Sequence, residues 1–89
     1  IYYVPFAPHN NSGPLSTLAD AHTCASVPNF LALEYHRIRD EGMEEILIKD
    51  EPLIIDGHVA LNEKPGLGAE LNEDYVKTML PEGETELWR

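Results

Sequence analysis

The sequence has a single cysteine, Cys24, among its 89 residues. One cysteine excludes a disulfide within the chain and favours a reducing compartment, so we expect a cytoplasmic protein. We interpret Cys24 as a small buried apolar residue. The sequence also lacks a signal peptide, and no apolar run approaches the roughly 18 residues that a membrane-spanning helix needs. It therefore indicates a soluble protein.

Positive charge is scarce. The sequence contains six Lys and Arg and 16 Asp and Glu, which gives a formal net charge of −10. Such an acidic balance argues against nucleic acid or an anionic membrane as a partner. We interpret it as a solvated acidic surface, and adaptation to a high-salt habitat is a second interpretation of the same charge.

Familiar catalytic and metal-binding signatures are absent from the sequence. It contains no Walker loop, dinucleotide-binding glycine fingerprint, HExxH motif, paired CxxC motifs or EF-hand loop. Ser12 and Ser16 have no neighbouring base that would activate a nucleophile. Any chemistry must therefore depend on residues brought together by the fold.

Charge is almost missing from residues 1–33, where Asp20 is the one formally charged residue. A stretch with so little charge is typical of parallel strands and their neighbours, which are buried on both faces. The rest of this short chain is too small to cover it. Because the sequence also begins at Ile1, without a methionine, we expect the chain to be part of a larger protein.

The same stretch predicts a strand, a helix and a second strand. Residues 4–7 are β-prone and stop at Pro8, residues 15–26 are helical in pattern, and residues 30–35 form the second strand. The predicted packed stripe of the helix has helical spacing: Leu15, Leu18, Ala19, His22 and Ala25. We expect His22 to be a hydrogen-bonded structural residue.

Strands joined through a helix lie parallel, so their C-terminal ends meet at one edge of the sheet. His9 and Glu34 follow or end the two predicted strands, and we expect them to lie together there. Two interpretations of Glu34 stay open: a carboxylate buried with a partner, or a strand that reaches the surface at that residue. Glu34 and His36 share a strand face, but two ligands do not make a metal site.

The second half is charged and irregular over residues 37–51, with either a helical turn or a short strand near 43–47. Asp56-Gly57 between apolar runs then predicts a hairpin over residues 52–61, with an exposed and inert His58 after the turn. Asn72 predicts the start of a short helix that Pro81 ends, and Trp88 is a candidate anchor in the polar tail.

Several ordered segments carry a resemblance to a known family. They are Phe6-Ala7-Pro8-His9-Asn10, Ser12-Gly13-Pro14, Pro28-Asn29-Phe30, Leu33-Glu34-Tyr35-His36, Asp56-Gly57-His58-Val59 and Lys64-Pro65-Gly66-Leu67-Gly68-Ala69-Glu70-Leu71. Over about residues 3–77, the chain resembles the C-terminal part of the mandelate racemase branch of the enolase superfamily. Within that branch it is most similar to sugar-acid dehydratases of the galactonate and gluconate type.

The resemblance implies an α/β fold: the C-terminal part of a modified TIM barrel, (β/α)7β, with the C-terminal segment of an α+β capping domain. Residues 1–36 would form the last two barrel strands and the helix between them. Residues 37–51 would be a connection, and residues 52–89 would join the cap. Barrel active sites lie at the C-terminal ends of the strands, where His9 and Glu34 fall.

The resemblance also implies a lyase mechanism on a sugar-acid carboxylate held by Mg²⁺. His9 would be the general base that removes the α-proton, and a protonated Glu34, its pKa raised by a water-poor pocket, would donate a hydrogen bond to the substrate carboxylate. Loss of the β-hydroxyl would leave a 2-keto-3-deoxy acid. Asn10 and His36 would contact the substrate. The Mg²⁺ ligands and the catalytic lysines have no counterpart in this chain.

The rest of the same enzyme would therefore be the first partner of this chain, in a homo-oligomer as the family tends to form. A racemase, epimerase or cycloisomerase of the same superfamily is one alternative. A non-catalytic acidic domain is another, in which the hairpin and helix bind a protein partner and His9 and Glu34 are structural. The near-absence of charge in residues 1–33 favours the enzyme, because a free-standing module would expose that apolar stretch to water.

Overall fold

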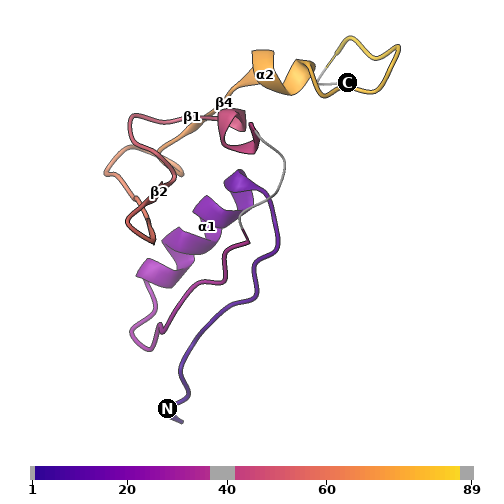
Figure 1. Cartoon of the computed structure of the whole chain (residues 1–89). Coiled ribbons are helices and arrows are strands. Elements are labelled where there is room, and N and C mark those ends of the chain that lie inside the picture. Colours follow the sequence, from indigo (N-terminus) through magenta and orange to yellow (C-terminus); the bar gives the residue numbers. More distant parts are fainter. Residues whose placement is uncertain (1, 37–41, 87–89) are drawn as a thin grey trace.

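The computed structural model describes residues 2–36 and 42–86. Along these residues, helical elements come before and after a run of short strands (Figure 1). In chain order they are α1 (Pro14–Ala25), the 3-10 helix η1 (Met43–Ile46), β1 (Leu47–Ile48), β2 (Ile54–Ile55), β3 (His58–Val59), β4 (Glu70–Leu71) and α2 (Glu73–Lys77). The anchor expected at Trp88 and the first part of the expected connection lie outside the described residues.

Helix α1 begins with Pro14 at its first turn, where the missing N–H of proline costs nothing. Its buried residues are Pro14, Thr17, Leu18, Ala21 and Cys24. The predicted stripe was therefore wrong by about one position, and Leu15 is 46% exposed. The burial of Cys24 and the helix itself are confirmed.

The two predicted strands on either side of α1 lie side by side as extended segments (Figure 1). A single parallel bridge joins Phe6 to Phe30. The Phe6 N–H donates to the Asn29 carbonyl at 2.8 Å, and the Leu31 N–H donates to the Phe6 carbonyl at 2.8 Å. The parallel pairing is confirmed, but it is shorter than predicted, because prolines flank Phe6 closely and have no N–H to extend the ladder.

The second half contains two small antiparallel pairs. β1 pairs with β4, so that Leu47 opposes Leu71. β2 and β3 form the predicted hairpin, and its turn residues Asp56 and Gly57 have φ values of 48° and 77°. Both residues are in the left-handed region, as a two-residue hairpin turn of this type requires. The region near 43–47 contains both predicted alternatives, a helical turn followed by a strand.

Helix α2 begins where the sequence predicted. Asn72 caps it, and its side-chain oxygen accepts a hydrogen bond from the Tyr75 N–H at 3.2 Å. Acidic residues follow in the first turn, where the helix dipole favours negative charge. Within the described residues, no helix has the length and apolarity needed to cross a membrane.

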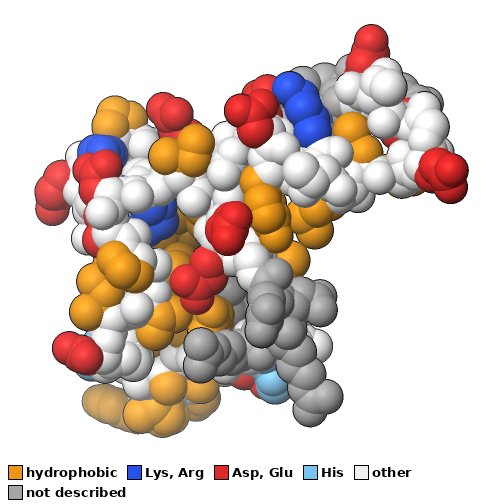
Figure 2. Space-filling view, turned by 45° about the horizontal axis from the view of Figure 1, so that its top comes forward, with side chains coloured by type: hydrophobic (Ala, Val, Ile, Leu, Met, Phe, Trp, Pro, Cys, Tyr) orange, Lys and Arg blue, Asp and Glu red, His pale blue; other side chains and the backbone are white. Residues whose placement is uncertain are grey.

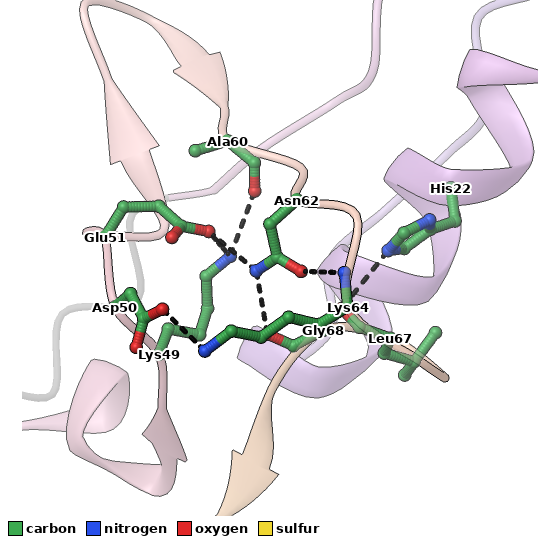
Figure 3. Close-up of polar contacts among 9 residues, drawn as sticks. All are labelled: His22, Lys49, Asp50, Glu51, Ala60, Asn62, Lys64, Leu67 and Gly68. Atoms are coloured by element: carbon green, nitrogen blue, oxygen red, sulfur yellow. Dashed lines mark hydrogen bonds and ion pairs between the residues drawn. The ribbon is translucent and has the colours of Figure 1, made fainter.

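A network of polar contacts joins the hairpin region to the loop before β4 (Figure 3). The Lys49 ammonium, on a side chain only 4% exposed, contacts the Glu51 carboxylate at 2.8 Å and donates to the Ala60 carbonyl at 3.0 Å. Asn62 Nδ2 donates to the same carboxylate at 3.0 Å and to the Gly68 carbonyl at 2.9 Å. These contacts join residues 49–68 into one unit.

His22 connects this unit to α1. Its Nε2 lies 3.2 Å from the Leu67 carbonyl oxygen (Figure 3), and the residue is half-buried. The expectation of a hydrogen-bonded structural histidine is confirmed. His58, by contrast, is exposed on the hairpin as predicted, with Nδ1 2.9 Å from the Asp56 carbonyl oxygen.

The core of the described residues is small and consists of Leu18, Ala21, Cys24 and Leu53. As expected, this chain alone does not bury residues 2–33 on both faces, because α1 covers only one side of the paired segments. Tyr2 is 83%, Val4 63% and Leu31 68% exposed. Acidic side chains project from many parts of the view in Figure 2. Extended apolar segments thus lie open on a molecule whose other surface is acidic.

Candidate active site

The site lies where the two parallel segments end. Pro8 stops the first segment, and the Glu34 N–H approaches the Pro8 carbonyl at 3.4 Å, which sets the register between them. In that register, His9 Nδ1 contacts Glu34 Oε2. The structure thus brings together two residues 25 positions apart, as the strand–helix–strand interpretation predicted.

Glu34 is the centre of the site. Its second oxygen, Oε1, lies 2.8 Å from Nε2 of His36, which projects from the same face two residues later. The backbone N–H of Asn10 donates to Oε2 at 2.8 Å. All four predicted site residues are therefore within one cluster around a single carboxylate.

These contacts stabilise the ionised form of Glu34. The hydrogen bond with His36 lowers the pKa of the carboxyl most, followed by the hydrogen bond from the Asn10 N–H, and partial desolvation opposes both. The nearby imidazoles also lower this pKa when they carry charge. Glu34 is therefore an acceptor in this arrangement.

The expectation of a raised Glu34 pKa in a water-poor pocket is wrong for this chain. The side chains of His9, His36 and Glu34 are 81%, 55% and 38% exposed. With so much water around the carboxylate, desolvation is small and the hydrogen bonds decide the direction of the shift. The described residues do not form a pocket that would bury the Glu34 carboxyl and raise its pKa.

Asn10 has a different environment from its neighbours. The residue is 2% exposed, and its side-chain Nδ2 donates to Thr17 Oγ1 on α1 at 2.9 Å. The side chain thus points into the fold while the peptide N–H points to Glu34. Substrate contact by Asn10 and His36 stays a prediction, as do the roles of His9 and Glu34.

Sequence reasoning missed Thr17. It is fully buried, at 0% exposure, beside Leu18. A signal was present, because Thr17, Ala21 and Cys24 recur at i, i+4 and i+7, the spacing of one helix face. The predicted stripe through Leu15 contains larger apolar residues, and the buried face was therefore assigned to that stripe and not to the face of Thr17.

The residues of the site do not fit Mg²⁺. It offers two imidazoles and one carboxylate whose oxygens both already accept hydrogen bonds, whereas Mg²⁺ prefers an octahedron of oxygen ligands. Across residues 2–36 and 42–86, no group of three or more His, Cys, Asp or Glu could hold a metal ion. Acid–base chemistry through His9, positioned by Glu34, is what this arrangement can support.

Comparison with known proteins places this chain in a family. The model of the family described as "Enolase C-terminal domain-like" matches residues 1–75. The chain is 47% identical over 85 residues to D-xylonate dehydratase of Haloferax volcanii, covering 96% of this chain and 20% of that protein. It is 30% identical over 97 residues to D-galactonate dehydratase of Xanthomonas campestris, covering 99% of this chain and 25% of the relative.

A solved structure agrees. A mandelate racemase/muconate lactonizing enzyme-like protein from Rubrobacter xylanophilus superposes with a TM-score of 0.77 at 49% identity, over 82% of this chain and 19% of that one. The chain thus spans a fifth to a quarter of the length of these relatives. The α/β fold, as part of a TIM-like barrel, is confirmed together with the resemblance. The chain belongs to the enolase C-terminal domain-like family.

Proposed function

We propose that this chain is the C-terminal part of a sugar-acid dehydratase. The main support is the contact between His9 and Glu34 where the two paired segments end. The 47% identity of the chain to a D-xylonate dehydratase supports the same conclusion. Residues 1–36 supply the last two barrel strands and their helix, residues 37–51 connect, and residues 52–89 join the capping domain. The exposed apolar side chains of Tyr2, Val4 and Leu31 support burial against the rest of the enzyme.

His9 is the general base of the proposed reaction. Its Nδ1 is engaged by the Glu34 carboxylate, so Nδ1 carries the proton and Nε2 keeps a free lone pair. Nε2 therefore accepts the proton α to the substrate carboxylate. An imidazole suits this step because its unperturbed pKa lies near neutrality.

Glu34 orients His9 and, in the complete active site, donates a hydrogen bond to the substrate carboxylate. Donation requires a protonated carboxyl, whereas the present hydrogen bonds lower its pKa. Bound substrate would bury the carboxyl further and so raise that pKa. Asn10 and His36 flank the same carboxylate and complete the substrate-facing edge.

The remaining chemistry comes from outside this chain. Mg²⁺, bound by ligands elsewhere in the enzyme, would neutralise the charge of the substrate carboxylate and of the enediolate. The β-hydroxyl would then leave as water, with a proton from an acid elsewhere in the enzyme, and the resulting enol would tautomerise to a 2-keto-3-deoxy acid. The single cysteine and the metabolic relatives support a cytoplasmic enzyme, and we expect a homo-oligomer.

Turnover of two sugar acids tests this function. The full-length enzyme, incubated separately with D-xylonate and D-galactonate in the presence of Mg²⁺, should release a 2-keto-3-deoxy acid from at least one of them. Product formation is followed by a colorimetric assay for the keto acid and by ¹H NMR. An epimerised substrate without keto acid would identify a racemase or epimerase, and no change in either acid would contradict the dehydratase proposal.

A further inference from the structure

Two polar side chains lie buried within the otherwise apolar interior of the described residues. Thr17 is 0% and Asn10 2% exposed, and they are the buried polar residues of that part of the chain. Burying a hydroxyl and an amide costs free energy unless they bind each other. Their mutual hydrogen bond, 2.9 Å from Asn10 Nδ2 to Thr17 Oγ1, meets that requirement.

The Asn10 amide is held at both of its polar ends. Nδ2 donates to Thr17, and Oδ1 accepts a hydrogen bond from the Ser12 N–H at 3.2 Å. Thr17 is itself fixed, because its N–H donates to the Gly13 carbonyl at 3.0 Å in the first turn of α1. The loop after His9 therefore has one defined position relative to the helix.

That position determines where the Asn10 peptide N–H points. It donates to Glu34 Oε2 at 2.8 Å, the oxygen that also contacts His9 Nδ1. Since the side chains of His9, Glu34 and His36 are exposed or only half-buried, water could hydrate them in several geometries. The buried pair is the rigid element beneath them.

We propose that Thr17 and the Asn10 side chain form a positioning pair, anchored on α1 by Thr17, which fixes the Glu34 carboxylate and through it the His9 imidazole. The catalytic consequence rests on the proposed dehydratase function. In this role both side chains act through the Asn10 peptide N–H and Glu34. Their effect is to hold His9 Nε2 at the orientation that proton transfer requires, and small errors in such orientation slow a reaction considerably.

Substitutions of Thr17 in the full-length enzyme test the pair. Thr17→Val keeps the volume but removes the hydroxyl, so kcat should fall about 10- to 100-fold with little change in KM. Thr17→Ser keeps the hydroxyl and should restore most of kcat. Thr23→Val is the matched control, because Thr23 Oγ1 makes an exposed bond to the Ala19 carbonyl on the same helix and leaves no buried group unpaired.

A second readout does not depend on turnover. The Asn10 N–H helps to lower the pKa of Glu34. If Thr17→Val weakens the hydrogen bond from the Asn10 N–H, the pKa of Glu34 should rise relative to wild type. Thr17→Ser should leave this pKa unchanged. ¹³C NMR of the Glu34 carboxyl measures the pKa in both variants. If wild type makes no keto acid, the dehydratase proposal fails, and this pKa comparison still decides the positioning role.

The proposal is overturned if Thr17→Val lowers stability but leaves both kcat and the Glu34 pKa unchanged, because the pair would then only support packing. Should Thr17→Val fail to fold, Thr17→Cys replaces it, since a thiol is a weak acceptor of nearly the same size. Thr17→Cys should then show the same two changes relative to Thr17→Ser. Equal behaviour of the two variants contradicts the proposal.

Discussion

At the scale of single residues, the candidate site is a set of side chains around one carboxylate. Glu34 binds His9, His36 and the Asn10 N–H through its two oxygens. The sequence predicted that His9 and Glu34 would meet. It did not predict that the surrounding donors would hold Glu34 ionised, because that depends on how much water reaches the carboxylate.

Replacement of His9 tests the base. In the full-length enzyme, His9→Asn should abolish exchange of the substrate α-proton with solvent, because Nε2 is lost, while Mg²⁺ binding stays nearly intact. Exchange in D₂O is followed by ¹H NMR, and metal binding by calorimetry. His58→Asn, at the exposed hairpin histidine, is the control and should retain exchange. Unchanged exchange in His9→Asn would remove this residue from the base role.

The pH dependence of stability tests the charge state of Glu34. Its pKa is lower in the folded chain than the roughly 4.3 of an unfolded chain, so its contacts stabilise the fold at neutral pH. That contribution is lost as pH falls through the folded pKa. Urea unfolding of the full-length protein should show that wild type exceeds Glu34→Gln in stability near pH 7 and that the difference narrows below about pH 4. A difference that grows in acid would contradict the lowered pKa.

At the scale of elements, local chemistry determines the second half well. The Asp56-Gly57 turn and the Asn72 cap each need only a few neighbouring residues, and both were predicted correctly. Two bonds of the polar network, Lys49 to Ala60 and Asn62 to Glu51, each join residues 11 positions apart and were not visible in the sequence (Figure 3). The network depends on a backbone conformation that glycine permits at one position.

Gly68 tests this network. Its φ of +71° is left-handed, and a Cβ there would lie 2.1 Å from Asn62 Oδ1. Gly68→Ala must therefore displace the Asn62 side chain, and we expect a loss of roughly 2–4 kcal/mol in the free energy of unfolding. Gly66→Ala is the control, because φ is +65° with open space around it, and should cost only about 1–2 kcal/mol. Urea unfolding of the full-length variants measures both, and equal losses would show that the contact with Asn62 is unimportant.

At the scale of the whole molecule, the chain is less compact than a free-standing domain. Its radius of gyration is 15.2 Å, against about 12 Å for a compact domain of this length. Helix α2 and the segment after it extend away from the remainder (Figure 1). Together with the exposed Tyr2, Val4 and Leu31, this shape supports completion by further protein.

Expression of residues 1–89 alone tests that interpretation. We expect a chain that self-associates or binds a hydrophobic dye such as ANS and unfolds without a sharp transition, because its apolar segments lack a cover. Size-exclusion chromatography and thermal unfolding by circular dichroism measure this. A soluble monomer with a cooperative transition would favour the alternative of an independent acidic domain.

The sequence by itself determined α1 to within one residue at each end, the hairpin, the capped α2 and the parallel approach of His9 to Glu34. These follow from turn residues, caps and the handedness of a strand–helix–strand unit, which act over short ranges or by topology. Only the tertiary structure decided which face of α1 is buried, how Asn10 binds Thr17, and that Glu34 is held ionised. Those outcomes depend on which side chains are packed together and shielded from water. Residues that are adjacent in the sequence do not determine this packing.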